Sequence, residues 1–145
     1  MKKLLAGLLL VSSVLSFGAT QRVPIEKLVG NGDGQLLYLE GENKPYSGEV
    51  ERKYPNGKLL GVATMKNGKL EGKAYEYYEN GKVNQKVAIK NGLFNGKVEK
   101  FSDKSGKLLG TGVMKDGLPD GEFVEYDEAG KVISKVKYKD GKEIK

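Results

Sequence analysis

Polar and apolar residues alternate in short stretches after residue 48, and glycine-containing turns separate these stretches. Leu59, Ala63 and Met65 lie an even number of residues apart, and the next stretch repeats similar spacing. Because successive side chains of a strand point to opposite faces, this spacing predicts strands with one apolar face. Between the apolar positions, the same face is expected to carry these small or polar residues: Gly61, Gln85, Gly110 and Ser134.

The stretches belong to a repeat of 24 residues, with one additional residue in the third copy. The four copies open at glycines, namely Gly48, Gly72, Gly96 and Gly121. Each copy contains a Gly-Lys turn and an Asn-Gly or Asp-Gly turn. The second kind favours the type I′ turn of a β-hairpin, in which both central residues take positive φ. The sequence therefore predicts an all-β fold, an elongated single-layer antiparallel sheet in which repeated β-hairpins form a meander.

Three segments are expected along the chain. Residues 1–19 have the features of a secretory signal peptide, because Lys2 and Lys3 precede an apolar run that small residues follow. Residues 20–35 fit no repeat and are interpreted as a leader or linker. Residues 36–145 are expected to form the repeat domain, which opens with a degenerate half-unit where Lys44 replaces a turn glycine. After cleavage, a secreted, periplasmic or cell-envelope location is expected.

The composition argues against an enzyme. The chain has no histidine and no cysteine, and these residues supply most near-neutral acid-base groups, thiolate nucleophiles and transition-metal ligands. Without cysteine there is also no disulfide framework and no lipid-modified cysteine. The segment Val29–Glu40 partly resembles a calcium loop, but Val29 stands where the first carboxylate ligand belongs. We expect no catalytic residue, no metal site and no cofactor.

Lysines flank the turns of every repeat. Without Lys2 and Lys3, the 25 basic residues fall to 23 against 19 acidic ones, a formal charge of +4. One lysine follows each Gly-Lys turn, namely Lys58, Lys82, Lys107 and Lys131. This lysine row is a candidate site for an anionic lipid, an acidic polysaccharide or another polyanion. Alternatively, the row keeps the sheet soluble and protects its edges. Interleaved glutamates dilute the charge, so nucleic acid is not favoured as a partner.

Three tyrosines in one repeat form the densest aromatic cluster, namely Tyr75, Tyr77 and Tyr78. Because neighbouring residues of a strand face opposite ways, one of Tyr77 and Tyr78 is expected to face away from the core side. An outward ring is a candidate surface for binding a partner. Core or cross-strand packing is the alternative for these rings.

The turn phrases "YPNGKLL", "YYENGKV" and "KNGKLEGKAYEYY" resemble the bacterial variant of the MORN repeat, which is also the unit of YwqK-like antitoxins. The resemblance covers about Tyr46 to Lys145. It implies a scaffold of the kind used for membrane association, protein docking or toxin neutralisation. We therefore expect a non-catalytic, exported scaffold that binds a protein or an envelope or host-surface component. An antitoxin or immunity role and polyanion binding through the lysine row are the alternatives.

Overall fold

The computed structural model describes residues 21–30 and 36–145. The expected signal peptide, residues 1–19, lies outside this part of the chain. So do Asn31, Asp33 and Gly34 of the segment that resembles a calcium loop. In the described residues, no helix is long and apolar enough to cross a membrane.

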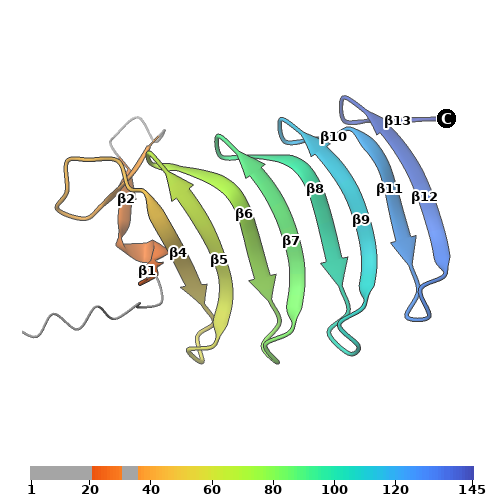
Figure 1. Ribbon diagram of the computed structural model, residues 1–145, viewed down its shortest axis with the longest axis horizontal. Helices are drawn as coiled ribbons and strands as arrows, with labels where there is room; N and C mark the ends of the chain where they lie inside the picture. Colours follow the sequence, from red (N-terminus) through yellow and green to blue (C-terminus); the bar gives the residue numbers. More distant parts are fainter. Residues whose placement is uncertain (1–20, 31–35) are drawn as a thin grey trace, which may run out of the picture.

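The described chain forms one long sheet of hairpins in a single layer (Figure 1). Its antiparallel strands follow one another in chain order: β4 (Gly48–Lys53), β5 (Leu59–Lys66), β6 (Lys69–Tyr77), β7 (Val83–Lys90), β8 (Leu93–Phe101), β9 (Leu108–Lys115), β10 (Leu118–Pro119), β11 (Gly121–Tyr126), β12 (Val132–Lys139) and β13 (Lys142–Ile144). Both β10 and β11 pair with β9. The predicted all-β hairpin meander is confirmed.

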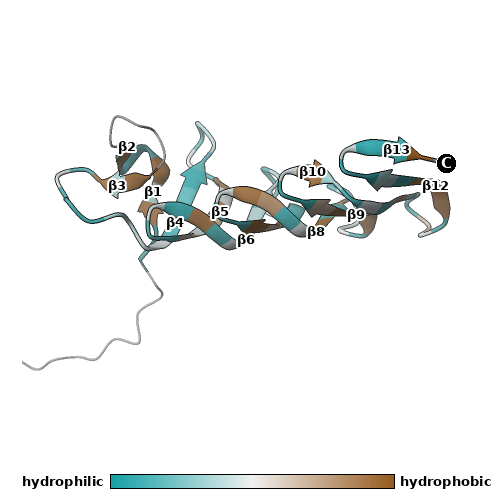
Figure 2. Ribbon diagram, turned by 90° about the horizontal axis from the view of Figure 1, so that it is seen from above, coloured by the Kyte–Doolittle hydropathy of each residue, from teal (hydrophilic) through white to brown (hydrophobic). Residues whose placement is uncertain are grey.

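The N-terminal part of the described chain departs from this pattern. β1 (Val23–Pro24) joins the sheet as a parallel neighbour of β4, and η1 (Ile25–Lys27) is a short 3-10 helix. β2 (Leu28–Gly30) and β3 (Leu37–Leu39) form a separate two-stranded sheet beside the ribbon (Figure 2). Part of the expected leader, residues 21–30, is therefore folded onto the first repeat, and the sheet contains one parallel pair.

The Asn-Gly and Asp-Gly turns have the predicted backbone. At the turn between β5 and β6, φ is 49° at Asn67 and 78° at Gly68. The corresponding pairs after β7, β9 and β12 also have positive φ at both residues. This is the backbone that a type I′ turn requires, and its twist matches that of the flanking strands. Local turn chemistry therefore sets the hairpin spacing.

The glycine that opens the second, third or fourth repeat marks a shift in strand register. In the β5–β6 pair, Met65 lies opposite Leu70, but Ala63 lies opposite Ala74. Additional residues on β6, around Gly72, are accommodated by a β-bulge, which bends the strand. At the fourth repeat, the same irregularity divides the strand into β10 and β11, and Gly121 takes a φ of 140°. Such a φ is rare for residues with a side chain.

Backbone hydrogen bonds join each Asn-Gly or Asp-Gly turn to the repeat before it. The Gly92 N–H donates to the Leu70 carbonyl at 2.8 Å, and the Gly141 N–H donates to the Pro119 carbonyl at 2.8 Å. The Gly68 N–H donates to the Tyr46 carbonyl at 2.7 Å, so the first repeat is joined to the preceding half-unit in the same way. Lys44 lies two residues before Tyr46, as Gly68 lies two residues before Leu70.

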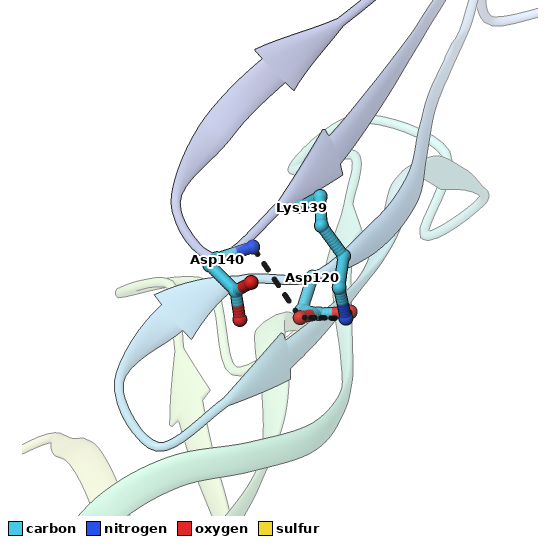
Figure 3. A network of polar contacts seen from close by, with 3 residues as sticks. All are labelled: Asp120, Lys139 and Asp140. Atoms are coloured by element: carbon cyan, nitrogen blue, oxygen red, sulfur yellow. Dashed lines mark hydrogen bonds and ion pairs between the residues drawn. The ribbon is translucent and has the colours of Figure 1, made fainter.

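A side-chain hydrogen bond reinforces the same contact between neighbouring repeats, which we call the joint. The residue before each opening glycine hydrogen-bonds to the next Asn-Gly or Asp-Gly turn: Ser47 to Asn67, Glu71 to Asn91, Asn95 to Asp116 and Asp120 to Asp140. Figure 3 shows the last case, in which the Asp120 carboxylate accepts from the Asp140 N–H and from Lys139 Nζ. Each turn is therefore fixed by the repeat that precedes it.

Aromatic hydroxyls join the repeats at the opposite edge. The Tyr54 hydroxyl donates to the Tyr77 carbonyl at 2.8 Å, and the Tyr78 hydroxyl donates to the Phe101 carbonyl at 2.8 Å. In the third repeat Ser102 takes the place of these tyrosines, and its hydroxyl donates to Glu128 at 2.5 Å. Ser102 is 1% exposed. The core between the two edges is thin, and its buried apolar residues are Val50, Met65, Val87, Ile89 and Val124.

Candidate functional site: two related hollows on one face of the ribbon

One face of the ribbon carries a continuous row of small, polar and charged residues. Cross-strand neighbours share a face, and the register connects them from β4 to β12. The row runs Arg52, Gly61, Glu76, Gln85, Lys100, Gly110, Glu125 and Ser134. The prediction that Gly61, Gln85, Gly110 and Ser134 share a face is therefore confirmed.

The first hollow lies at the N-terminal part of this row and has a volume of about 190 Å³. Gly61 forms its floor between Arg52 and Glu76. Because Gly61 has no side chain, the Arg52 guanidinium reaches across β5 to Glu76, with 3.6 Å between Nη2 and Oε1. Gln85 Nε2 donates to the other carboxylate oxygen at 3.0 Å. Ile25 of η1 lines the hollow and supplies an apolar side chain from outside the repeats.

The second hollow lies over β8 to β12 and has a volume of about 290 Å³. Gly110 forms its floor between Lys100 and Glu125, and Phe123 and Tyr138 form an apolar wall. The two rings meet edge to face, with centroids 5.3 Å apart. Among the described residues, neither Lys100 nor Glu125 has an ion-pair partner within 4.0 Å. The hollow therefore combines an apolar wall with a cation and an anion, both of which are available to a ligand.

The two hollows occupy equivalent places in a larger repeat of two units. Their residues correspond at an offset of 48 or 49 positions: Val50 with Val98, Arg52 with Lys100, Gly61 with Gly110, Glu76 with Glu125 and Gln85 with Ser134. The sequence carries the signal, because Lys-Leu-Leu-Gly follows the first turn of the first and third units only. Alternation predicts that the glycines share a face, but it does not reveal this pairing of alternate units.

The candidate lysines do not form a single free row. All four are exposed, but Lys82 Nζ donates to the Lys104 carbonyl and Lys107 Nζ donates to the Glu128 carbonyl at 3.0 Å. Lys58 lines a separate open hollow of about 470 Å³ beside Tyr77 and Tyr78. Lys131 lies at the last of these turns. At least two members of the row therefore connect neighbouring turns. Lys58 shares a hollow with Tyr77 and Tyr78, and the Lys82 carbonyl accepts a hydrogen bond from the Tyr78 N–H at 2.8 Å.

The three candidate tyrosines are half-buried. Tyr75 lies opposite Val62 and Lys86, in a row adjacent to that of Glu76, so its side chain points away from the face with the two hollows. β6 ends at Tyr77, and Tyr78 begins the turn. The Tyr78 hydroxyl is used in the bond to Phe101. Partial burial raises the pKa of Tyr78, and the nearby Asp103 carboxylate adds to this effect. Tyr78 therefore has a structural role in joining two repeats.

The described residues offer recognition groups that are dispersed along the ribbon. They contain no group of three or more acidic, histidine or cysteine side chains that could hold a metal ion. Glu76 and Glu125 lie in different hollows, and Glu76 is already bonded to Arg52 and Gln85. An apolar wall with a few placed polar groups is instead typical of sites that hold a side chain or small group of a ligand.

A comparison with known families matches three segments of the chain to the MORN repeat variant, at residues 46–67, 70–91 and 119–140. No curated protein matches the chain, and no solved structure matches it. Each matched segment begins at a carbonyl that accepts a turn-glycine hydrogen bond, and it ends just before that glycine: Tyr46 with Gly68, Leu70 with Gly92, Pro119 with Gly141. The matched unit is therefore the same hairpin unit that the hydrogen bonds define, and three such units of the chain match the MORN repeat variant.

Proposed function

We propose that the protein is a non-catalytic, exported scaffold that binds another protein through the face with the two hollows. The observation that carries this proposal is the internal duplication of the hollow, with a cation, a glycine floor and a glutamate at equivalent places. A side chain at either floor would fill the hollow. A surface that contacts one partner at two equivalent points would contain such a duplication.

The spacing of the hollows favours one kind of partner. Gly61 lies on β5 and Gly110 on β9, four strands further along the sheet. At about 4.8 Å per strand, the floors are about 19 Å apart. A partner with two apolar side chains at that separation would engage both hollows at once, and the second contact would then form at a high effective concentration. Ile25 in the first hollow shows the type of side chain that fits.

The test fills the second hollow without disturbing the fold. At Gly110 an added Cβ would have ordinary contacts, with the closest atom, the Val124 carbonyl oxygen, at 3.7 Å. Gly110→Met is therefore expected to fold and to occupy the hollow. Val113→Met, at an exposed position three residues further along β9 and on the opposite face, is the matched control. In capture experiments from cell-envelope extract, wild type and Val113→Met should retain one common protein that Gly110→Met loses.

Two results would contradict this function. One is equal retention of the captured protein by all three baits, which would place the contact elsewhere. The other is a hydrolytic or transfer activity in the purified chain that disappears with a single substitution. Either result can be obtained with the same three purified proteins, and circular dichroism of each shows whether Gly110→Met has kept the sheet.

The immunity alternative is a special case in which the partner is a toxin. It draws on the resemblance to antitoxins and on the same two hollows. Its test is co-expression with a toxic product of a neighbouring gene: the wild-type chain should restore growth, and Gly110→Met should not. Rescue by both chains would separate immunity from the hollows.

The polyanion alternative relies on the lysine row. It requires that binding to anionic vesicles or to an acidic polysaccharide falls steeply with salt. It also requires that changing Lys58, Lys82, Lys107 and Lys131 to Gln abolishes binding, whereas changing Lys66, Lys90, Lys115 and Lys139 does not. The carbonyl bonds of Lys82 and Lys107 predict that the first set also costs some stability.

A further inference from the structure

The outer edge of β12 is open along much of its length. β13 pairs with Lys137, Tyr138 and Lys139. Within residues 21–30 and 36–145, no strand pairs with Val132–Val136 on the side away from β11. This stretch also exposes apolar side chains, since Val132 is 42% and Ile133 is 63% exposed. An unpaired, partly apolar edge is a template on which another strand can form.

The hydrogen-bonding groups that face outward can be assigned from the turn. Lys139 and Lys142 flank the two-residue turn Asp140–Gly141, so they form a hydrogen-bonded pair. Along an antiparallel strand, every second residue directs its N–H and C=O to the same side. Lys137 is the next such residue, and it lies opposite Ile144. The N–H and C=O of Lys135 therefore point outward beyond the end of β13.

The net charge of the chain is concentrated beside this edge. Of the 25 basic and 19 acidic residues, six lysines and two acids lie in residues 131–145, which gives +4. Residues 21–130 contain 17 basic and 17 acidic residues and are neutral. Residues 131–145 are therefore strongly basic, as are residues 82–97 with four lysines and no acid, and a basic open edge favours an acidic partner.

The ribbon itself shows which strand fits such an edge. β7 is equivalent to β12 at an offset of 49 residues, so Lys86 corresponds to Lys135. On β7, Val87 lies opposite Val98 and Lys86 lies opposite Glu99. Lys86 Nζ also sits over the Phe101 ring, 4.9 Å from its centroid. The strand that covers β7 thus presents an apolar residue, then an acid, and an aromatic residue two positions later.

We propose that the open edge of β12 accepts an extended acidic segment of another protein as an antiparallel strand. The segment places an apolar residue opposite Val136, an acid opposite Lys135 and an aromatic ring under the Lys135 side chain. Lys135 Nζ now pairs with Glu122 Oε1 at 3.2 Å, and the incoming acid shares or replaces this contact. Main-chain bonds to Lys135 provide affinity, and the three side chains provide the register. This surface adjoins the second hollow, which Val136 also lines, but it uses the main chain of the β12 edge and the Lys135 side chain. Gly110→Met should therefore leave it intact while removing the proposed function, so the two failures can be distinguished.

A second copy of the chain fits this edge less well than an acidic partner. Pairing β12 with β12 of another copy would bring together two segments of charge +4. β4 carries an acid at the matching place, because Glu51 corresponds to Glu99. However, β1 already pairs with β4 at Val50 and Glu51. A head-to-tail contact would therefore have to displace β1.

The experiment uses the full mature chain and an end-blocked peptide, Gly-Glu-Val-Glu-Glu-Phe, which is the segment Gly96–Phe101 with both lysines replaced by glutamate. Titration followed by NMR should shift the amide signals of residues 131–137 and slow hydrogen exchange at the Lys135 N–H. A scrambled peptide of the same composition has the same charge and is the control for non-specific attraction. It should bind more weakly and should not protect Lys135.

Charge exchange tests the register. Lys135→Glu should weaken binding of the peptide about tenfold, because an attractive cross-strand pair becomes a repulsive one. A peptide with lysine in place of its middle glutamate should recover binding to this variant. Lys137→Glu changes the net charge equally, but β13 already covers the outward groups of Lys137, so it should have a smaller effect.

Several outcomes would overturn the proposal. Equal losses from Lys135→Glu and Lys137→Glu, or equal binding of the scrambled peptide, would show attraction by charge alone. Shifts confined to hollow residues outside β12, such as Gly61 and Gly110, would place the peptide on the face of the sheet. Protection of Lys135 without peptide, together with a dimer in sedimentation experiments, would assign the edge to a second copy.

Discussion

The ring of Phe123 fills the space that a side chain at Gly112 would occupy. A Cβ at Gly112 would lie 2.3 Å from Cε1 of that ring and 2.4 Å from Cδ1. In the corresponding place of the first hollow, Ala63 lies opposite Ala74, and two small residues share the space. Where the first hollow has two alanines, the second hollow has a glycine and a phenylalanine. This difference gives the second hollow its aromatic wall.

Gly112→Ala should therefore destabilise the protein and reshape the second hollow. The ring of Phe123 has to move, and overpacking of this kind costs about 1–3 kcal/mol. Gly110→Ala, two residues away, is the control, because its Cβ would meet nothing closer than 3.7 Å. Urea unfolding of both variants measures the difference in the free energy of unfolding. Equal values for the two variants would contradict the packing described for Phe123.

Removal of the Tyr78 hydroxyl should loosen the joint between the second and third repeats. Tyr78→Phe deletes the donor to the Phe101 carbonyl and should lower the free energy of unfolding by about 0.5–1.5 kcal/mol. Tyr77→Phe removes a hydroxyl that donates no hydrogen bond to another described residue, so this neighbouring change should have little effect. Thermal unfolding followed by circular dichroism compares them. A larger loss from Tyr77→Phe would refute the assignment.

The asparagine at each turn should tolerate glycine better than alanine. Asn91 has a φ of 51°, and a left-handed backbone costs an ordinary residue about 1–2 kcal/mol. Asn91→Ala should therefore destabilise the chain by about 1 kcal/mol, while Asn91→Gly should be close to neutral. A shift in the denaturant midpoint measures this difference, provided that the dependence of the free energy of unfolding on denaturant concentration is unchanged. The opposite ranking would argue against the type I′ backbone at this turn.

Acid should weaken the joint drawn in Figure 3. The hydrogen bond from Lys139 is the main reason why the pKa of Asp120 is below its ordinary value of 3.8, and the same bond raises the pKa of Lys139 above 10.5. A lowered carboxyl pKa contributes stability above the unfolded value, and that contribution is lost as pH falls through the folded value. The raised lysine pKa contributes below 10.5 and is lost as pH rises through the folded value.

Asp120→Asn should thus flatten the dependence of stability on pH below 3.8 and above 10.5, compared with wild type. Glu125→Gln removes a carboxylate that makes no hydrogen bond to another described side chain and is the control. Unfolding free energies measured across both ranges give the two slopes. Identical profiles for wild type and Asp120→Asn would show that this pair contributes nothing to the joint.

Features fixed by local chemistry could be predicted from the sequence. Asn67 and Gly68 specify their turn because both must take positive φ, and alternation alone placed Gly61 and Gly110 on one face. Features that depend on register between distant residues could not. The bulge at Gly72 shifts the pairing after the turn, and the parallel docking of Val23–Pro24 on β4 has no periodic signal.

The candidate site could be predicted from the sequence only in part, for the same reason. Lys58 and the tyrosines stood out as a row and a cluster, but the bond of the Tyr78 hydroxyl to Phe101 spans two repeats. Likewise, the approach of Arg52 to Glu76 depends on the absence of a side chain at Gly61, on the strand between them. Predicting such relationships requires the register of three adjacent strands. The turn spacing gives this register except where a bulge shifts it.

The turn-to-turn bonds between neighbouring repeats also determine how the ribbon would respond to a pulling force. β1 and β13 lie at opposite ends of the sheet (Figure 1), so tension between them would open the strand pairs in sequence instead of shearing them all at once. A full unit of 24 residues, such as Gly48 to Gly72, would add about 80 Å of extended chain when released. A tether built this way would lengthen in steps of one repeat, and the repeats still folded would keep their hollows.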